Sequence, residues 1–175
     1  MLRNKQKLRF KNSVKAIISA LTIVFLLIGC QKEILTVFPQ EALQENMRTI
    51  NGENSTFEDI LQKHKGETIF IDIWASWCRD CLVGIPGIKE IQKNNPQLTY
   101  LFLSLDRNEA QWKKAIEKYA LLGEHYYVKS GMRGTFGTSI GLDWIPRYMV
   151  VNPDGSIKLF EAIETDDVAL LEALK

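Results

Sequence analysis

Two cysteines separated by two residues, Cys78 and Cys81, follow directly after the apolar run 68–75. If this run is a buried strand and a helix begins near Cys78, the first thiol lies among unpaired backbone N–H groups, where the helix dipole favours a thiolate. The second thiol then lies one turn further along the helix, where it can close a disulfide with the first thiol or displace a partner attached to it. This spacing indicates thiol–disulfide chemistry.

Three other kinds of site also use a Cys-x-x-Cys pair: zinc sites, iron–sulfur sites and structural disulfides. Zinc takes four ligands, whereas the chain has three cysteines and two histidines, and His64 and His125 lack the paired spacing of a zinc module. A structural disulfide stays open as an alternative, because exported proteins often contain them. Closing so short a loop restricts the unfolded chain little, however, so its stabilising effect is small. We therefore favour redox chemistry and expect no metal and no other cofactor.

The residues around the cysteines resemble a known family. The segment 71–81, Ile-Asp-Ile-Trp-Ala-Ser-Trp-Cys-Arg-Asp-Cys, is similar to the active-site segment of thioredoxin-like proteins, in particular the membrane-attached thiol–disulfide oxidoreductases of the TlpA/ResA type. Pro86 stands where these proteins kink the active-site helix, and Ile145-Pro146 stands where they carry a cis-proline. The resemblance covers about residues 55–175. It implies a thioredoxin-like α/β fold, in which a mixed central β-sheet is flanked by α-helices.

The resemblance implies different roles for the two cysteines. Cys78 is expected to attack, because it lies nearest the helix N-terminus and is the better stabilised thiolate and the more exposed thiol. Its thiolate forms a mixed disulfide with a partner, and Cys81 then resolves this intermediate, which leaves a reduced partner and a Cys78–Cys81 disulfide. The same two sulfur atoms serve the reverse reaction.

Asp72 interrupts an otherwise apolar run, and burying a carboxylate without a partner is unfavourable. By position, Asp72 matches the internal acid of the family. There it is expected to have a raised pKa and to accept the proton of Cys81 as that thiol attacks the mixed disulfide. The alternative is structural: Asp72 points outward at a strand edge or pairs with a lysine.

Residues near the thiols are expected to contact the substrate. If the Ile145–Pro146 peptide bond is cis, as the resemblance implies, the Ile145 backbone lies beside the thiols and offers N–H and C=O groups to a substrate strand. A trans proline that opens a strand is the commoner alternative. Trp77, together with Trp74 and Trp144, is expected to provide apolar surface around the disulfide, although aromatic residues near strand ends are often core residues.

Two departures from the family pattern concern charge. Arg79-Asp80 stands between the cysteines, where many relatives have proline at the second place, and Arg147 follows Pro146, where a small hydroxyl residue is common. Arg79 is expected to stabilise the Cys78 thiolate and Asp80 to oppose it by a similar amount, so the sequence does not decide the redox potential. We expect the charge of Asp80 to influence the choice of partner.

The first 29 residues have the pattern of a secretory signal peptide. Residues 1–29 contain six basic residues and no acid, and their apolar run 14–28 is short for a membrane-spanning helix. Leu27-Ile28-Gly29-Cys30 resembles the lipobox of bacterial lipoproteins, which implies cleavage before Cys30 and a lipid on its sulfur. An uncleaved signal anchor is the alternative. In either case the chain is held at a membrane of the bacterial cell envelope, facing the periplasm or the cell exterior, where disulfides persist.

The charge balance changes once this segment is set aside. The whole chain has 22 basic and 21 acidic residues, whereas residues 30–175 have 16 basic and 21 acidic residues and a net charge of −5. Basic residues do not cluster with aromatic ones, so binding to nucleic acid is disfavoured. The expected partners are protein disulfide substrates and an upstream thiol reductant, and we expect the protein to be a monomer.

Residues 30–175 suffice for one domain with a substantial core and are too few for two typical domains. Residues 30–54 mix polar and apolar residues without a steady period, which predicts a tether that leads into a short helix or an irregular segment. The thioredoxin-like domain is expected to span residues 55–175, and Ser55-Thr56 offers an N-cap for its first helix.

Strands and helices alternate in the rest of the chain, which predicts parallel strands joined by helices. Strands are expected near residues 68–75, 98–105, 147–152 and 156–161, with a short extended piece at 125–128, and helices near 78–94, near 108–121 and from a cap at 165–167 to 174. The turn 152–155, Asn-Pro-Asp-Gly, joins the last two strands. The thiols then lie at the carboxyl end of a central strand, where open α/β sheets place their sites.

We expect an enzyme, a thiol–disulfide oxidoreductase that reduces protein disulfides. A non-catalytic binding module with a passive disulfide is the main alternative. A thiol peroxidase shares the fold, but Ile71 and Ala75 occupy the places of the proline and threonine usual before its reactive cysteine. Copper delivery requires a nearby set of histidines or methionines, and none is evident.

Overall fold

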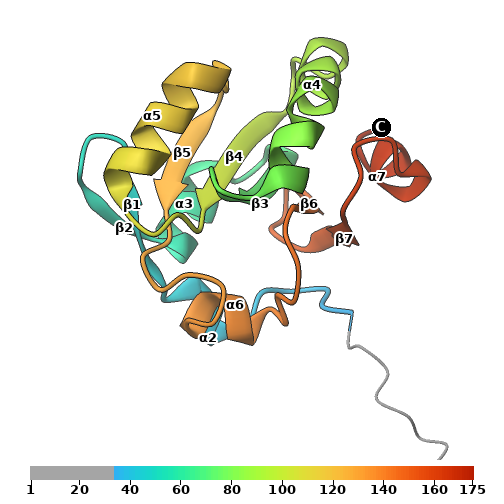
Figure 1. The fold of residues 1–175 in the computed structure, drawn as a ribbon. Helices are drawn as coiled ribbons and strands as arrows, with labels where there is room; N and C mark the ends of the chain where they lie inside the picture. The colour runs from blue at the N-terminus through green and yellow to red at the C-terminus, as the bar shows by residue number, and fades with distance from the viewer. Residues whose placement is uncertain (1–33) are drawn as a thin grey trace, which may run out of the picture. The chain divides into compact units, whose positions relative to one another are not determined.

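The computed structural model describes residues 34–175, and its strands form one seven-stranded sheet (Figure 1). The strands are β1 (Asn46–Thr49), β2 (Asn54–Thr56), β3 (Ile69–Trp74), β4 (Thr99–Ser104), β5 (Glu124–Tyr127), β6 (Arg147–Val151) and β7 (Ile157–Ala162). The helices are α2 (Gln40–Leu43), α3 (Phe57–Lys63), α4 (Arg79–Asn94), α5 (Glu109–Tyr119), α6 (Thr135–Ser139) and α7 (Val168–Ala173). The predicted signal peptide and Cys30 lie outside the described residues.

The sheet is mixed, as predicted, and β3 lies near its middle. The strand order is β2-β1-β5-β4-β3-β6-β7. β3 pairs in parallel with β4 and antiparallel with β6, and β4 pairs in parallel with β5. Parallel neighbours need a crossover connection, which α4 provides between β3 and β4 and α5 provides between β4 and β5. The carboxyl ends of these three parallel strands therefore meet at one edge of the sheet.

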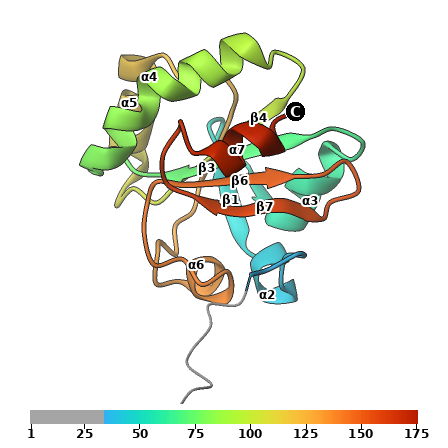
Figure 2. The ribbon, with the colours of Figure 1, turned by 90° about the vertical axis from the view of Figure 1, so that its right-hand side faces the viewer.

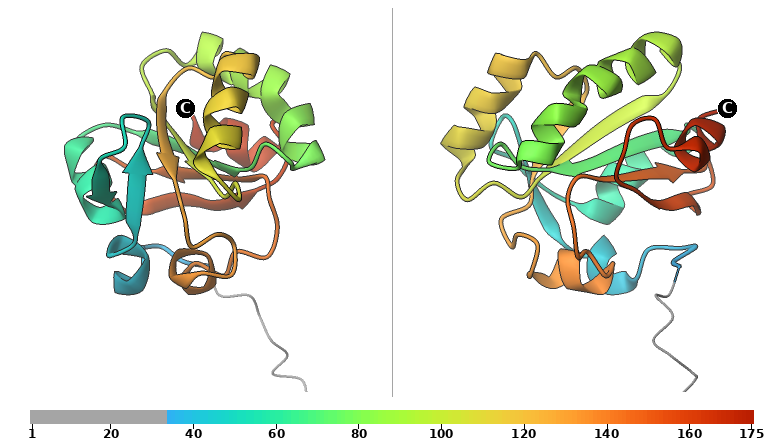
Figure 3. Two further views of the ribbon diagram at one scale, coloured as in Figure 1. Left: turned by 60° about the vertical axis from the view of Figure 1, so that its left-hand side comes forward. Right: turned by 45° about the vertical axis from the view of Figure 1, so that its right-hand side comes forward.

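Helices cover both faces of the sheet. α4, α5 and α7 lie over one face, and α2, α3 and α6 lie over the other (Figures 2 and 3). All six residues of β3 are buried, which is the expected outcome for a continuous apolar strand between two helical layers. This central strand is the rigid element from which the cysteine-bearing loop emerges.

α4 forms because its apolar residues repeat at helical spacing. Cys81, Ile85, Ile88 and Ile91 are its buried residues, three or four positions apart, so they line one face toward the sheet. Pro86 lies inside the helix on its exposed side. The predicted helix near residues 78–94 is thus confirmed, and its first turn carries both cysteines.

The organised domain begins earlier than predicted. β1 pairs with β2 and also with β5, so it extends the main sheet. Met47 is fully buried, and the ring of Phe38 packs edge-on against Phe57 with 4.9 Å between centroids. Residues 35–54 therefore belong to the compact unit Leu35–Lys175 and are not a tether. The short helix expected in this segment is α2. The strands β1 and β2 have three or four residues and are too short to display a period, which is why the sequence pattern missed them.

The remaining elements lie within a few residues of their predicted positions. The extended piece expected at 125–128 is β5, and the closing helix is α7, capped by the side chain of Asp167. The glycine-rich segment before Pro146 contains an unpredicted short helix, α6. Within residues 34–175, no helix has the length and hydrophobicity needed to cross a bilayer.

Candidate active site

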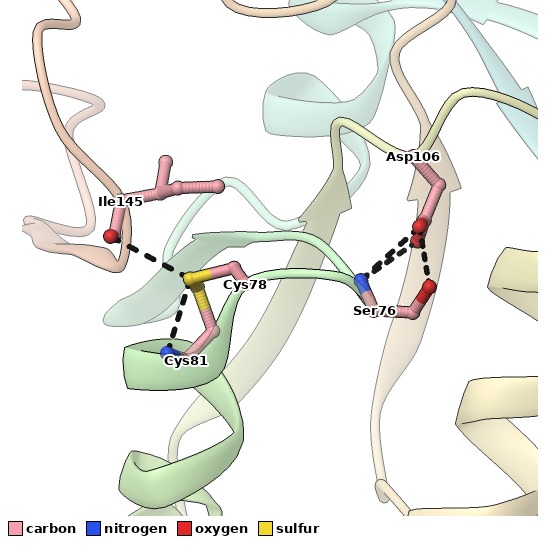
Figure 4. The surroundings of a disulfide bond; sticks show 5 residues. All are labelled: Ser76, Cys78, Cys81, Asp106 and Ile145. Carbon is pink, nitrogen blue, oxygen red and sulfur yellow. Dashed lines mark hydrogen bonds between the residues drawn. A yellow bond between two sulfur atoms is a disulfide. The ribbon is translucent and has the colours of Figure 1, made fainter.

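Cys78 and Cys81 lie at the N-terminus of α4 and are joined by a disulfide (Figure 4). Cys78 is the N-cap residue, with extended backbone, and its Sγ accepts a hydrogen bond from the Cys81 backbone N–H at 3.1 Å. The expectation that a helix begins near Cys78 is confirmed. In the reduced protein, a Cys78 thiolate would accept the same N–H bond at the positive end of the α4 dipole.

The two sulfurs differ in accessibility. Cys78 is 7% exposed and Cys81 is 2% exposed. Cys78 is at the entrance of α4, while Cys81 is on the face of the helix that packs against the sheet. A partner can therefore approach Cys78 more easily, and Cys81 lies behind it.

The Ile145–Pro146 peptide bond is cis, as the resemblance implies. The Ile145 carbonyl oxygen lies 3.6 Å from Cys78 Sγ (Figure 4). Pairing of β6 with β3 brings this loop to the carboxyl end of β3, beside the thiols. A disulfide sulfur carries no hydrogen, so this contact becomes a thiol–carbonyl hydrogen bond only in the reduced protein.

A largely apolar groove of about 320 Å³ opens next to Cys78. Its lining residues are Trp77, Cys78, Arg79, Asp80, Met132, Asp143, Trp144 and Ile145. The side chains of Trp77 and Trp144 are about half exposed, at 53% and 54%. Trp74, in contrast, is 1% exposed inside β3, so the expectation that it surrounds the disulfide as surface is wrong. Its position in a strand buried on both faces makes it a core residue.

Asp72 lies inside the sheet, 3% exposed. In the strand register it stands between Phe102 of β4 and Tyr148 of β6. Burial raises its pKa to about 8, because the charged carboxylate loses hydration. The alternative of an outward-pointing or lysine-paired carboxylate is wrong, since Asp72 is buried within β3 and burial is the only influence on its pKa.

Arg147, noted in the sequence as a departure from the family pattern, is fully buried. Its Nη2 donates to Asp143 Oδ1 at 2.7 Å and lies 3.2 Å from Glu161 Oε1. Its guanidinium also lies over the Phe160 ring, with 5.4 Å between Cζ and the centroid. Asp143 lines the groove, so this buried cation supports the groove wall from beneath.

Asp106 anchors the loop that carries the cysteines, and sequence reasoning missed it. Both of its carboxylate oxygens accept from the Ser76 backbone N–H at 3.1 Å, and Oδ1 also accepts from the Ser76 hydroxyl at 2.5 Å (Figure 4). Oδ2 accepts from the Ser104 hydroxyl at 2.9 Å. An acid directly after the apolar run 98–105 was the available signal, because carboxyl ends of neighbouring parallel strands share one edge of the sheet.

Residues 66–157 match the family described as Thioredoxin-like. The chain belongs to the thioredoxin-like family. Two curated proteins are similar to this thioredoxin-like chain. Thioredoxin-like protein YneN of Bacillus subtilis is 24% identical over 110 residues, which are 61% of this chain and 62% of that protein. Thiol:disulfide interchange protein DsbE of Haemophilus influenzae is 25% identical over 124 residues, which are 70% of this chain and 65% of that protein.

A solved structure shows the same fold. The solution structure of a candidate thiol-disulfide oxidoreductase from Bacteroides vulgatus superposes with a TM-score of 0.63 and 28% identity, covering 78% of this chain and 86% of that chain. The present thioredoxin-like chain spans less than two thirds of the length of the two curated relatives. Among residues 34–175, no group of three or more His, Cys, Asp or Glu side chains is placed to hold a metal ion.

Proposed function

We propose that this chain is a thiol–disulfide oxidoreductase that reduces protein disulfides outside the cytoplasm. The observation that carries the proposal is the placement of Cys78. It caps α4, forms a disulfide with the more deeply buried Cys81, and lies 3.6 Å from the carbonyl oxygen of Ile145, which precedes a cis-proline. The family membership and the names of the relatives support the same chemistry.

The proposed reaction transfers two electrons from the dithiol to the partner. The Cys78 thiolate attacks one sulfur of the partner disulfide, which forms a mixed disulfide and expels the other partner sulfur as a thiolate. Cys81 then loses its proton and attacks Cys78 Sγ, which forms the Cys78–Cys81 bond and expels the second partner thiolate. An upstream thiol reductant reverses these steps on the enzyme and restores the dithiol.

Asp72 is proposed to accept the proton of Cys81. Its burial on the sheet and its pKa of about 8 suit this role, because a group that titrates near neutral pH can both take up and release a proton. Asp72→Asn should therefore slow resolution of the mixed disulfide more than its formation. Equal effects on both steps would remove this role.

The groove residues are proposed to bind the partner chain. Trp77 and Trp144 offer exposed apolar surface, and the Ile145 backbone is next to Cys78. Arg79 and Asp80 are exposed at the first turn of α4 and line the same groove. Their opposite charges are placed to affect which partners dock there.

The location of the protein is also a proposal. The basic N-terminal stretch, the apolar run and the segment ending at Cys30 support export and lipid attachment to a membrane of the cell envelope. Export would place the dithiol where protein disulfides form and persist. Radiolabelled palmitate on wild-type protein, absent from a Cys30→Ser variant, is the result expected from this assignment.

Partner trapping tests the function directly. A Cys81→Ser variant should stall as a mixed disulfide through Cys78, and the trapped proteins should be released by dithiothreitol. A Cys78→Ser variant is the matched control, because it retains one cysteine of the pair but lacks the attacking thiol. Wild-type protein should also accelerate insulin reduction by dithiothreitol. Recovery of no more protein than the control, together with no acceleration, would favour the binding module with a passive disulfide.

A further inference from the structure

Two buried oxygens near the proposed site have no hydrogen-bond partner among the described residues: Asp72 Oδ1 and Tyr148 Oη. Tyr148 is fully buried and Asp72 is 3% exposed. Buried polar groups in folded proteins are almost always hydrogen-bonded, so an unpartnered pair requires an explanation. The two oxygens belong to neighbouring residues, which suggests one explanation for both.

Asp72 and Tyr148 stand directly opposite each other in the β3–β6 register. Opposed residues of an antiparallel pair point to the same face of a sheet. That face is the one covered by α4, because the Tyr148 hydroxyl lies beneath Gly84 of that helix. Cys81 is three positions before Gly84 and is buried on the same side of α4. The acid, the phenol and the resolving thiol therefore lie in one layer between α4 and the sheet.

The surroundings of Tyr148 extend to a segment at the protein surface. Thr165 follows β7 and lies close to both Gly84 and Gly87 of α4, and its neighbour Glu164 is exposed. Burial raises the pKa of Tyr148, and the charges of Asp72 and Glu164 raise it further. The hydroxyl is therefore within electrostatic reach of the buried acid on one side and of a surface carboxylate on the other.

The proposed role of Asp72 requires a path by which its proton reaches solvent. In each catalytic cycle it must take one proton from Cys81 and later release it, but the residue opposite it on β4 is Phe102, which carries no proton-transferring group. On β6 the residue opposite is Tyr148. A hydroxyl can accept one proton while it passes on another, and so relays protons without becoming charged.

We propose that the Tyr148 hydroxyl relays the proton of Asp72 to solvent at the Glu164–Thr165 segment. This inference rests on the proposed function. Cys81 S–H gives its proton to the Asp72 carboxylate and its electron pair to the new bond with Cys78, which expels the partner thiolate. The Asp72 carboxylic acid then passes a proton to Tyr148 Oη as the Tyr148 proton leaves for solvent. The two oxygens are not hydrogen-bonded to each other, so the proposed relay passes through a water molecule between them.

The test separates the two chemical steps. Reduced protein is mixed with a limiting amount of 5,5′-dithiobis(2-nitrobenzoate) in a stopped-flow instrument. The first thionitrobenzoate is released when Cys78 attacks, and the second when Cys81 resolves the mixed disulfide. In Tyr148→Phe, the first phase should keep its wild-type rate, and the second should slow by about tenfold. The pH midpoint of the second phase should move upward, because the Asp72 carboxylate loses the donor that the relay supplies through the bridging water.

Tyr100→Phe is the matched control. The Tyr100 hydroxyl is also buried beneath α4, but it donates to the backbone carbonyls of Ile91 and Asn95. Its loss should lower thermal stability and leave the second phase and its pH midpoint unchanged. An unchanged second phase in Tyr148→Phe overturns the relay, as does an equal slowing in Tyr100→Phe. If wild-type protein releases no rapid first thionitrobenzoate, the proposed function itself fails, and this outcome is distinct from a failure of the relay alone.

Discussion

The Arg147 guanidinium donates to the Asp143 carboxylate across 2.7 Å and so links a fully buried cation to the exposed rim of the groove. Glu161 of β7 lies 3.2 Å from the same nitrogen. The segment from Asp143 to Ile145 forms one wall of the groove beside Cys78. Arg147 thus holds this wall against β7, at the point where the chain enters β6.

The first prediction compares the two ways to break this ion pair. The double variant Asp143→Asn, Glu161→Gln should lower the free energy of unfolding by about 2–3 kcal/mol, because the guanidinium stays buried with less negative charge nearby. Arg147→Met should lower it less, since both carboxylates reach solvent, with side chains 64% and 31% exposed. Urea denaturation of the variants measures both values. A larger loss in Arg147→Met than in the double variant would show that packing of the long side chain dominates.

The second prediction concerns the Asp106–Ser76 contact. Asp106→Asn should lower the free energy of unfolding by about 2 kcal/mol, because a buried carboxylate that accepts from three donors is replaced by a group that also carries donors. Ser76→Ala removes only the hydroxyl and should lower the free energy of unfolding by about 1 kcal/mol. Hydrogen exchange of the Ser76 amide should accelerate in Asp106→Asn. Ser104→Ala is the control, because it removes a donor to the same carboxylate and leaves the Ser76 bonds in place.

Much of this architecture follows from the sequence. Apolar runs such as the one at residues 68–75, alternating with helical segments, predicted the central strands and α4 close to their observed bounds. The position of Cys78 at the start of a helix followed from the apolar run and the cysteine spacing, whereas the cis-proline came from the resemblance to thioredoxin-like proteins. The short strands β1 and β2 were missed, because three or four residues do not establish a period.

The supporting contacts of the site could not be predicted in the same way. Arg147 looks like a surface cation in the sequence, and its burial depends on carboxylates four and fourteen positions away. Asp106 accepts hydrogen bonds from Ser76 only because β3 and β4 end side by side. Tyr148 meets Asp72 through strand register. Each of these relationships joins separate elements, so local patterns carry no signal for it.

The third prediction concerns substrate binding in the groove. Trp77→Ala and Trp144→Ala should each raise the KM for a protein disulfide by about tenfold, because exposed aromatic residues at a binding surface contribute about 1.4 kcal/mol or more. Their rates with 5,5′-dithiobis(2-nitrobenzoate) should change little, because a small disulfide needs only access to Cys78. Val83→Ala removes an exposed apolar side chain of α4 that does not line the groove and is the control. Equal slowing with both disulfides would indicate that the tryptophans act on the thiols.

The fourth prediction is a pH dependence of stability that comes from Asp72. Burial raises its pKa from 3.8 to about 8 in the folded protein. Between these values the folded state binds the proton and the unfolded state does not, so stability decreases as pH rises through this range and the full penalty is present above pH 8. Asp72→Asn removes this pH-dependent loss of stability. The variant should match wild type near pH 4 and exceed its free energy of unfolding above pH 8, by at most about 6 kcal/mol.

Urea denaturation of wild type and Asp72→Asn at several pH values measures this difference. The subtraction cancels the contributions of the other carboxylates, which titrate in both proteins. A constant difference across the pH range would mean that Asp72 keeps an ordinary pKa in the folded protein. Its assignment as the proton acceptor of Cys81 would then lose its physical basis.

The fifth prediction concerns Gly84, which leaves room in α4 for the Tyr148 hydroxyl. A methyl group at Gly84 would collide with this oxygen. Gly84→Ala should therefore lower the free energy of unfolding by about 1–2 kcal/mol, although alanine is favoured over glycine in helices by about 1 kcal/mol. In a Tyr148→Phe background the oxygen is absent, so the same substitution should be neutral or stabilising. The double-mutant cycle should give a coupling of at least about 1 kcal/mol.

Gly87→Ala is the control for this cycle. A methyl group at Gly87 meets the side chain of Thr165 and not Tyr148. Gly87→Ala should therefore change the free energy of unfolding by the same amount in the wild-type and Tyr148→Phe backgrounds. If Gly84→Ala also has equal effects in both backgrounds, the hydroxyl does not lie beneath α4 in solution. The proposed relay would then lose the contact that places Tyr148 in the same layer as Cys81 and Asp72.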